Sequence, residues 1–590
     1  MQYITSIVRA FRDRGVDRTF SLMGDGDMYF QVAFKAAGGR IYNARHEAAA
    51  LNMADGYARA SGQVAVCTVT RGPGLAQLAT PLMVAGRYGA PVVVFCGTSP
   101  PKDGMQYLDQ AMFLKGCETP YVEADGSRPA HEVVDEVFEM ALTLRKPVVL
   151  AMSDPVQLRP DPFPPREVGP AAREIAPPAP IDAGELAAAV QAIQASRTPT
   201  IVIGRGVDTP EAVAAVEALA ERLGAPVSTT LLAKGAPLSP RVPHLGIAGG
   251  LSLPATERIF ARTDLVIAIG LSMAAGTSRS GKLFTQDKVL RIDRDPAVTG
   301  TGPVLHGEAA QALAALVGAL PRSNDPNAEW RDYVASELSV DPRLEEMAEY
   351  QPQLDPGTVD PRRLMIELDE VIPDNAVVVI GGGHSLAFPP TFLTQRGRTF
   401  ISSYSFGAVG QTFPTAIGVA TAFPDRPVVG FEGDVGFFMH LQELDTAVRE
   451  NIDLTYVVMN DEAIGAEYHR LQHEKLDYQM AQIDTPSLDA VARAFGARAY
   501  RIDAEDQIRP VAADALAGSG FRLIDARISR SVVSRHFRIG RVHLDRPAPG
   551  AAPPAELPPA AAPTREDRAG PSLMGWLSSA GRRLVGQGDR

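Results

Sequence analysis

Cysteine is scarce in this sequence, and long apolar runs are missing. Only Cys67, Cys96 and Cys117 occur among 590 residues, and none belongs to a CxxC pair. Neither a disulfide framework nor a zinc site is therefore indicated. Cys67 and Cys96 lie in apolar, strand-like runs and are expected to pack in the core. No apolar run approaches the about 20 residues that cross a bilayer, so no membrane span is expected.

An excess of positive charge is also missing. The chain has 57 Lys and Arg against 69 Asp and Glu, a net charge of −12. This balance argues against nucleic acid or an anionic membrane as a partner. The first residues, MQYITSIVRAFRDRG, mix charged with apolar side chains and lack the apolar core of a signal peptide, so a cytoplasmic location is expected. With 45% hydrophobic and 21% charged residues, the chain is globular in composition and long enough for several domains.

Apolar runs of strand length alternate with helical patterns along the chain. Runs such as VAVCTVT (64–70) and PVVVFCG (91–97) are typical of parallel strands that are buried on both faces. The pattern predicts an α/β protein with three doubly wound parallel-sheet domains, at 1–155, 183–320 and 361–540. Proline-rich or polar linkers are expected between them at 155–182 and 321–360. A Pro/Ala-rich tail at 545–590 is expected to be disordered.

Residues 427–463 are the most informative stretch, because their pattern predicts a strand, a tight turn, a helix and a second strand. The turn is Gly433-Asp434-Val435-Gly436, and the second strand ends at Asn460-Asp461. Ligands of open α/β sheets bind at the carboxyl ends of the strands, so Asp434 and Asp461 could hold one hard cation. Gly433 and Gly436 would let the backbone approach a phosphate at the start of the helix.

This stretch resembles the diphosphate-anchoring motif of thiamine diphosphate (ThDP) enzymes, in which GDG is followed after about 25–30 residues by NN. Val435 stands in place of the usual glycine, and Asp461 in place of the usual metal-binding asparagine. The resemblance implies that Asp434, Asp461 and Ala463 bind Mg²⁺, and that Gly433, Val435 and Gly436 contact the cofactor. The extra negative charge of Asp461 suggests a change in metal affinity or metal preference.

Two N-terminal motifs resemble the pyrimidine-binding segments of the same family. Glu47 opens HEAAALNMADGYARASG; by itself, a carboxylate at the start of a helix complements the helix dipole. The resemblance implies that Glu47 hydrogen-bonds the aminopyrimidine ring and shares the proton that activates the cofactor. The segment Thr70-Arg71-Gly72-Pro73-Gly74 resembles the family's TSGPG turn, so Gly72 and Pro73 are predicted to face this ring. Arg71 replaces the serine and is expected to face substrate or solvent.

Two further motifs belong to the third domain. The loop Gly381-Gly382-Gly383-His384-Ser385 resembles the diphosphate-binding loop, which implies that Gly383, His384 and Ser385 bind the diphosphate. A plain strand-to-helix connection is the alternative. Val409 stands where the family has a larger apolar residue that wedges beneath the cofactor and brings its two rings together. Core packing is the alternative for Val409.

The substrate end of the site is less well defined. Asp25, in the turn MGDG, either relays a proton or caps the turn. Gln106, in MQYLDQ, matches the glutamine of the synthases' FQEVDQ, although Tyr107 replaces its glutamate. His46 and His469 are also candidates for contact with the substrate, with a surface or packing role as the alternative.

The central domain resembles the one that holds FAD in acetohydroxyacid synthases. TTLLAKGA (229–236) and GIAGG (246–250) are similar to its loops, but the GARFDDR-like segment is replaced by GLSMAAG at 270–276. FAD could be held by these loops but is not expected to be bound.

The motifs together resemble the acetolactate synthase, pyruvate oxidase and benzoylformate decarboxylase group. The resemblance implies ThDP- and Mg²⁺-dependent decarboxylation of a pyruvate-like 2-oxo acid, with carboligation to a second carbonyl compound as in acetolactate synthase. A non-oxidative 2-oxo acid decarboxylase is one alternative, although the His-His pair of pyruvate decarboxylase is missing. A catalytically silent homologue that acts as a regulatory subunit is another. The family's sites lie between subunits, so a homodimer or homotetramer is expected.

Overall fold

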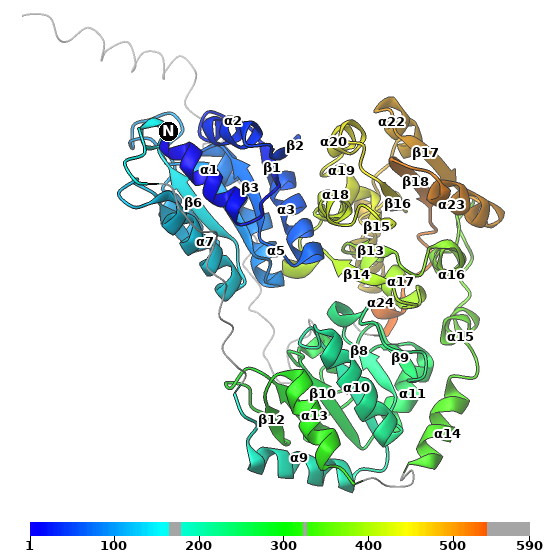
Figure 1. The fold of residues 1–590 in the computed structure, drawn as a ribbon. Helices are drawn as coiled ribbons and strands as arrows, with labels where there is room; N and C mark the ends of the chain where they lie inside the picture. The colour runs from blue at the N-terminus through cyan, green and yellow to red at the C-terminus, as the bar shows by residue number, and fades with distance from the viewer. Residues whose placement is uncertain (165–178, 322–326, 540–590) are drawn as a thin grey trace, which may run out of the picture. The chain divides into compact units, whose positions relative to one another are not determined.

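The computed structural model describes residues 1–164, 179–321 and 327–539. It contains three six-stranded sheets, and Figure 1 shows their strands and the helices that connect them. All paired strands in these sheets run parallel, which confirms the predicted α/β fold. The tail predicted at 545–590 lies outside the described residues. None of the described helices is long and apolar enough to cross a membrane.

The first sheet has the strand order β2-β1-β3-β4-β6-β5. Cys67 and Cys96 are fully buried in β3 and β4, as predicted. Its strands are β1 Arg18–Leu22, β2 Arg40–Asn43, β3 Ala65–Val69, β4 Val92–Gly97, β5 Tyr121–Glu123 and β6 Val148–Met152. The helices of this part are α1 Tyr3–Asp13, α2 Met28–Ala36, α3 Glu47–Ser61, α4 Pro73–Ala76, α5 Ala79–Tyr88, α6 Gln110–Gly116, α7 Ala130–Leu144 and α8 Asp154–Leu158.

The second sheet has the order β12-β11-β10-β7-β8-β9. Local signals set its helices: α10 starts where the Thr209 side chain accepts a hydrogen bond from the Ala212 N–H, and it ends at the left-handed Gly224. The strands are β7 Pro199–Ile203, β8 Val227–Thr229, β9 His244–Ile247, β10 Leu265–Ile269, β11 Val289–Asp293 and β12 Val304–His306. The helices are α9 Ala183–Ala195, α10 Pro210–Leu223, η1 Leu231–Ala233, α11 Pro254–Arg262, α12 Ala275–Ser278, η2 Gln286–Lys288 and α13 Ala309–Ala319.

The third sheet has the order β14-β13-β15-β16-β18-β17. Its strands are β13 Val377–Ile380, β14 Thr399–Ser402, β15 Val428–Gly433, β16 Leu454–Asn460, β17 Arg498–Ile502 and β18 Phe521–Arg527. Its helices are α16 Pro361–Val371, α17 His384–Phe392, η3 Ser405–Gly407, α18 Thr412–Ala422, α19 Asp434–Phe438, α20 Glu443–Arg449, α21 Gly465–His473, η4 Tyr478–Ala481, α22 Leu488–Ala494, η5 Glu505–Gln507, α23 Ile508–Ala517 and α24 Arg535–Ile539. The single helix predicted after the Asp434 turn is thus two helices, because His440 between them turns to the carbonyl of Gly410.

The first and third sheets share one strand order. Counted from its own first strand, each reads 2-1-3-4-6-5. In both, the chain changes direction between the first and third strands of the unit, and ligands of open α/β sheets bind at such switch points. In the first sheet this point lies between β1 and β3, and in the third between β13 and β15. The predicted motifs at Gly72, Gly383 and Asp434 follow these strands.

The segment predicted as a second linker includes two helices. It contains α14 Ala328–Glu337 and α15 Pro342–Glu349. Trp330 is buried and donates its indole N–H to the carbonyl of Pro199, at 2.9 Å. Glu346 is also buried and pairs with Arg535 and Arg538. The prediction of a polar linker did not anticipate these anchoring contacts, because few of the residues in the segment are apolar.

Helices α3 and α18 pack so closely that their backbones are in contact. A Cβ on Gly418 would overlap the carbonyl of Met53, and a Cβ on Gly56 would overlap the carbonyl of Thr415. Asn52 Nδ2 donates to Gln411 Oε1 at 2.7 Å within the same contact. Glycine at these two positions therefore lets the helix that begins with Glu47 lie directly against the third domain.

Candidate active site

Two buried carboxylates lie at the carboxyl edge of the third sheet. Asp434 begins α19 after β15, and Asp461 follows the neighbouring strand β16; they are 1% and 5% exposed. Thr485 Oγ1 donates to Asp434 Oδ2 at 2.8 Å, whereas Asp434 Oδ1 has no partner among the described residues. Burial, and then the negative charge of Asp461, raise the pKa of Asp434 to about 8. The two acids therefore favour a bound cation or a shared proton.

His384 lies beside these acids. Gly383, with φ of 62°, turns the chain from β13 into α17, and His384 is the first residue of that helix. Its Nε2 lies 3.1 Å from Asp461 Oδ2, and its Nδ1 has no partner within the described ranges. Ser385 Oγ donates to the carbonyl of Gly382 at 2.7 Å. The loop predicted to bind the diphosphate thus meets the predicted metal ligands.

His469 lies beside His384. It is 4% exposed, and its ring centroid is 5.0 Å from that of His384. Its Nε2 is 2.8 Å from the carbonyl of Arg530, and burial lowers the pKa of His469 to about 4. A neutral, buried imidazole in this position supports the packing alternative.

Four predicted residues meet at the carboxyl edge of the first sheet. A Cβ on Gly74 would lie 3.6 Å from Glu47 Oε1, so Glu47 borders the Gly72-Pro73 turn. Gly72, at φ of 54°, has the main chain of Gln106 packed against it. Asp25 is linked to the same place by a 2.6 Å hydrogen bond from Thr70 Oγ1.

Two other predicted residues have local partners. His46 caps α3, since its Nδ1 accepts from the Ala48 N–H at 3.0 Å. Arg71 points toward acidic residues of its own domain. Its Nη2 lies 2.5 Å from Asp154 Oδ1, and its Nε lies 3.9 Å from Asp25 Oδ1. Its side chain is only 13% exposed, so it does not face solvent.

Helices α3 and α18 hold the first and third domains in contact within one chain. Glu443, which the sequence analysis did not identify, accepts the Arg45 N–H at 3.0 Å and so holds the start of α3. The His46 ring lies edge-on to His440, with centroids 5.8 Å apart. Val409 lies in the loop before α18 and is 42% exposed, so it does not pack in the core of the described chain.

Three family models match the chain in the order of its sheets. The N-terminal TPP binding domain of thiamine pyrophosphate enzymes matches residues 1–115, their central domain matches 186–316, and their C-terminal TPP binding domain matches 381–526. Thiamine pyrophosphate is another name for ThDP. The chain belongs to the thiamine pyrophosphate enzymes. The resemblance found in the sequence is therefore confirmed.

Several curated ThDP enzymes are similar over most of the chain. A probable acetolactate synthase large subunit of Methanococcus aeolicus is 27% identical over 522 residues, covering 82% of this chain and 85% of its own. A sulfoacetaldehyde acetyltransferase of Alcaligenes xylosoxydans xylosoxydans is 27% identical over 546 residues, covering 84% and 87%. An acetolactate synthase of Mycobacterium avium is 28% identical over 536 residues, covering 85% and 83%.

The residues at the third sheet fit a ThDP diphosphate and its metal. Asp434 Oδ1 and His384 Nδ1 are buried polar atoms that lack a hydrogen-bond partner within the described chain, and Asp461 Oδ2 has only its 3.1 Å contact with His384 Nε2. Such atoms are costly unless a ligand satisfies them. The described residues contain no group of three or more acidic, His or Cys side chains able to hold a metal. Mg²⁺ is commonly held by one or two carboxylates together with phosphate oxygens and water, which suits this pair.

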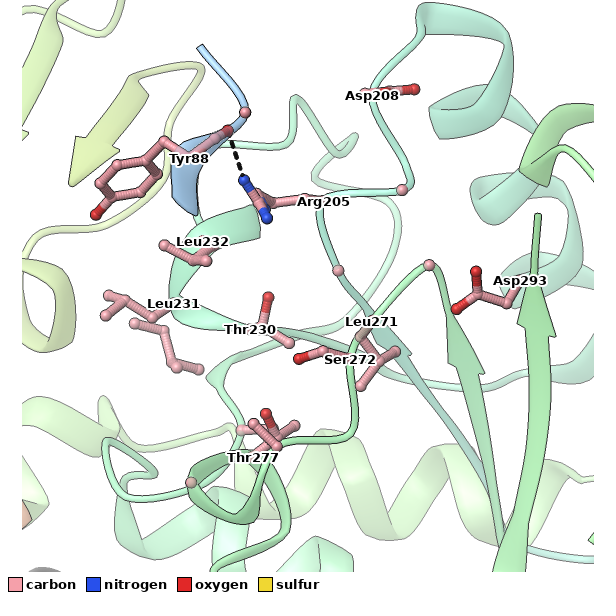
Figure 2. Close-up of a pocket in the computed structure, with 18 of the residues that line it drawn as sticks. Tyr88, Arg205, Asp208, Thr230, Leu231, Leu232, Leu271, Ser272, Thr277 and Asp293 are labelled. Carbon is pink, nitrogen blue, oxygen red and sulfur yellow. Dashed lines mark hydrogen bonds between the residues drawn. The ribbon is translucent and has the colours of Figure 1, made fainter. Parts of the chain in front are cut away.

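A separate cavity of about 640 Å³ lies at the edge of the central domain, where residues 86–89 of the first domain also line it (Figure 2). Loops that follow β7, β8 and β10 line it, and Gly206 and Gly270 touch where two of these loops cross. Arg205 donates to the carbonyl of Tyr88 at 2.9 Å, and Asp293 lies at the end of β11. The cavity is lined by parts of the two FAD-like loops, 229–236 and 246–250, and by the divergent segment 270–276. Its volume is in the range of small-molecule sites.

Proposed function

We propose that the protein is a ThDP- and Mg²⁺-dependent enzyme of the acetolactate synthase type, which decarboxylates a pyruvate-like 2-oxo acid and joins the remaining fragment to a second carbonyl compound. The observation that carries the proposal is the pair of buried carboxylates, Asp434 and Asp461, with the unpartnered atoms Asp434 Oδ1 and His384 Nδ1 beside them. They lie in the matched TPP binding domain, and the helix that begins with Glu47 packs against that domain. The names of the acetolactate synthase relatives suggest the reaction type.

Glu47 is the proposed proton-holding group. Its carboxylate is partly buried at the start of α3, beside the Gly72-Pro73 turn. It would share a proton with the aminopyrimidine ring, which is the role of a general acid and base. When bound, ThDP supplies the nucleophilic carbon and accepts the electron pair released by decarboxylation.

The third domain is proposed to hold the charged end of the cofactor. Asp434 and Asp461 would bind Mg²⁺ with oxygen atoms, and Ala463 has only its main-chain carbonyl to offer. Gly383 and Ser385 would place the backbone of their turn close to the diphosphate. The partly exposed Val409 would meet the face of the cofactor.

Asp25 lies at the proposed substrate end of the site. The hydroxyl of Thr70, with Arg71 and Gln106 nearby, lowers the pKa of the Asp25 carboxyl. An ionised carboxylate accepts hydrogen bonds, so Asp25 would orient a substrate hydroxyl or a water molecule.

A second candidate is an acetyltransferase acting on sulfoacetaldehyde, because relatives with that name are as similar as the synthases. The test is turnover by the purified full chain with ThDP and Mg²⁺, with products identified by NMR. Pyruvate and sulfoacetaldehyde should be supplied separately. Acetolactate or acetoin from pyruvate would support the proposal, whereas acetaldehyde would make the protein a simple decarboxylase. Turnover of sulfoacetaldehyde alone would favour the second candidate.

Binding of ThDP without turnover of any 2-oxo acid would support the third alternative, a silent regulatory homologue. Glu47→Gln is the matched control, because it keeps the size of the side chain and removes its charge. Activity that is unchanged in this variant would remove Glu47 from the mechanism. Failure of the wild-type protein to bind ThDP would refute the proposal as a whole.

A further inference from the structure

Asp461 is in contact with one imidazole and no strong cation. Its Oδ2 lies 3.1 Å from His384 Nε2, and the two side chains are 3% and 5% exposed. In the part of the chain that the structure describes, no lysine or arginine forms an ion pair with Asp434 or Asp461. His384 is therefore the group best placed to orient the Asp461 carboxylate.

The surroundings of His384 hold its ring in place. Its centroid lies 5.4 Å from that of Phe388 and 5.0 Å from that of His469. His469 is itself fixed by its contact with the Arg530 carbonyl. The His384 ring thus packs against two aromatic rings, which is how a side chain that orients another group is kept from rotating.

Gly465 makes room for the contact between His384 and Asp461. It is the first residue of α21, and a Cβ built on it would overlap both Asp461 Oδ2 and the His384 ring. The backbone of Gly465 does not have a positive φ. Glycine is therefore needed for space rather than for conformation, and the space it leaves is occupied by this one pair.

We propose that His384 is a positioning residue for Asp461: the Nε2–H holds one oxygen of the carboxylate, so that Asp461 presents its other oxygen to a divalent metal. Groups that orient metal ligands through hydrogen bonds commonly change metal affinity by about ten- to a hundredfold when they are removed. The inference rests on the ThDP and metal site proposed above, and it assigns to His384 a role toward Asp461 in addition to any contact with the diphosphate.

Two substitutions distinguish the role of Nε2 of His384 from that of Nδ1. The amide nitrogen of glutamine reaches about as far as Nε2, whereas that of asparagine reaches only as far as Nδ1. His384→Gln should therefore preserve the contact with Asp461, and His384→Asn should break it. Binding of ThDP and Mg²⁺ to the metal-free full chain, measured by calorimetry, is the readout.

We expect His384→Asn to raise the Kd for Mg²⁺, at fixed ThDP, by about tenfold or more, and His384→Gln to raise it much less. In an Asp461→Asn background, the effect of His384→Asn should fall to about threefold or less, because a neutral amide makes a weaker hydrogen bond. Thr485→Val is the control background, since Thr485 contacts Asp434 instead. There, His384→Asn should keep its full effect.

Equal effects of His384→Asn in the wild-type and Asp461→Asn backgrounds would overturn the proposal. The proposal would also be overturned if His384→Asn left the Kd for Mg²⁺ unchanged while His384→Gln raised it. The nitrogen that affects metal binding would then be Nδ1. Circular dichroism of the metal-free variants checks the fold. If His384→Asn does not fold, Gly465→Ala tests the same contact with both side chains retained, and an unchanged Kd would refute it. A wild-type protein that binds no ThDP would instead refute the proposed function.

Discussion

Replacing Asp461 with asparagine should stabilise the metal-free protein while weakening its binding of Mg²⁺. Asp434 and Asp461 are both buried, and among the described residues neither is paired with a lysine or arginine; Asp461 contacts the His384 imidazole. Asparagine keeps the shape of the side chain and removes its negative charge. The repulsion between the two carboxylates is then lost, and with it a charge that attracts the metal.

The pKa of Asp434 sets the size of the effect. It is raised from 3.8 to about 8, first by burial and then by Asp461. At about 1.36 kcal/mol per pKa unit, this difference changes the free energy of unfolding by on the order of 5 kcal/mol between low and high pH. The folded-state pKa is the higher one, so this stability is fully present below about pH 4 and is lost as the pH rises through about 8. Because burial is the larger cause, Asp461→Asn should restore about 1–2 kcal/mol at pH 8.

Thermal unfolding in EDTA tests this at two pH values. The melting temperature of Asp461→Asn should exceed that of the wild type by a few degrees at about pH 8 and by less at about pH 5. Asp506→Asn, an exposed carboxylate of the same domain, is the control and should change little at either pH. A lower melting temperature of metal-free Asp461→Asn, or a gain that does not depend on pH, would refute the reasoning.

Three further predictions concern how the site is assembled. Glu47→Gln should lose most turnover, roughly a hundredfold or more, while calorimetry still detects ThDP binding; loss of binding as well would mean that Glu47 mainly shapes the site. Gly418→Val should separate α3 from α18, destabilising the protein by about 1–3 kcal/mol in denaturant titrations and lowering activity; Gly318→Val, at an exposed helical glycine with open space around it, is the control. Mixing and reassociating the two inactive proteins Glu47→Gln and Asp434→Asn should restore about a quarter of wild-type activity if sites are shared between the subunits of a dimer, because half of the dimers are hybrids with one intact site out of two. No activity should return if each chain builds its own site.

The architecture could be predicted from the sequence because its strands are short, apolar and buried on both faces. Glycine-containing turns and acidic residues at the ends of these strands also pointed to the edges where the switch points lie. The cofactor could be inferred because several motifs with a chemical purpose recur in one order. Glu47, Asp434, His384 and Asp461 all lie at strand ends or helix starts, where position along the chain nearly determines position in space.

The contacts that complete the site could not be predicted, because they join residues far apart in the chain. Thr485 meets Asp434 from a polar loop that carries no motif. Arg71 is directed inward because Gly26 and Gly97 leave room beside it, and its own neighbours in the sequence give no sign of this. The burial of His469 similarly depends on Arg530 and on the His384 ring. Partners of this kind are set by tertiary packing, which local periodicity does not encode.

The shared strand order of the first and third sheets has a consequence for how this chain can change. Two sheets with the same strand order would hold the two chemically different ends of one cofactor. The difference in what each sheet edge binds must therefore come from the loops and not from the strand order. The third sheet places its two acids after the neighbouring strands β15 and β16, while the first places Glu47, Thr70 and Asp25 near its own edge. Substrate preference could therefore be redesigned through the loops after β1 and β3, with the charged anchor left untouched.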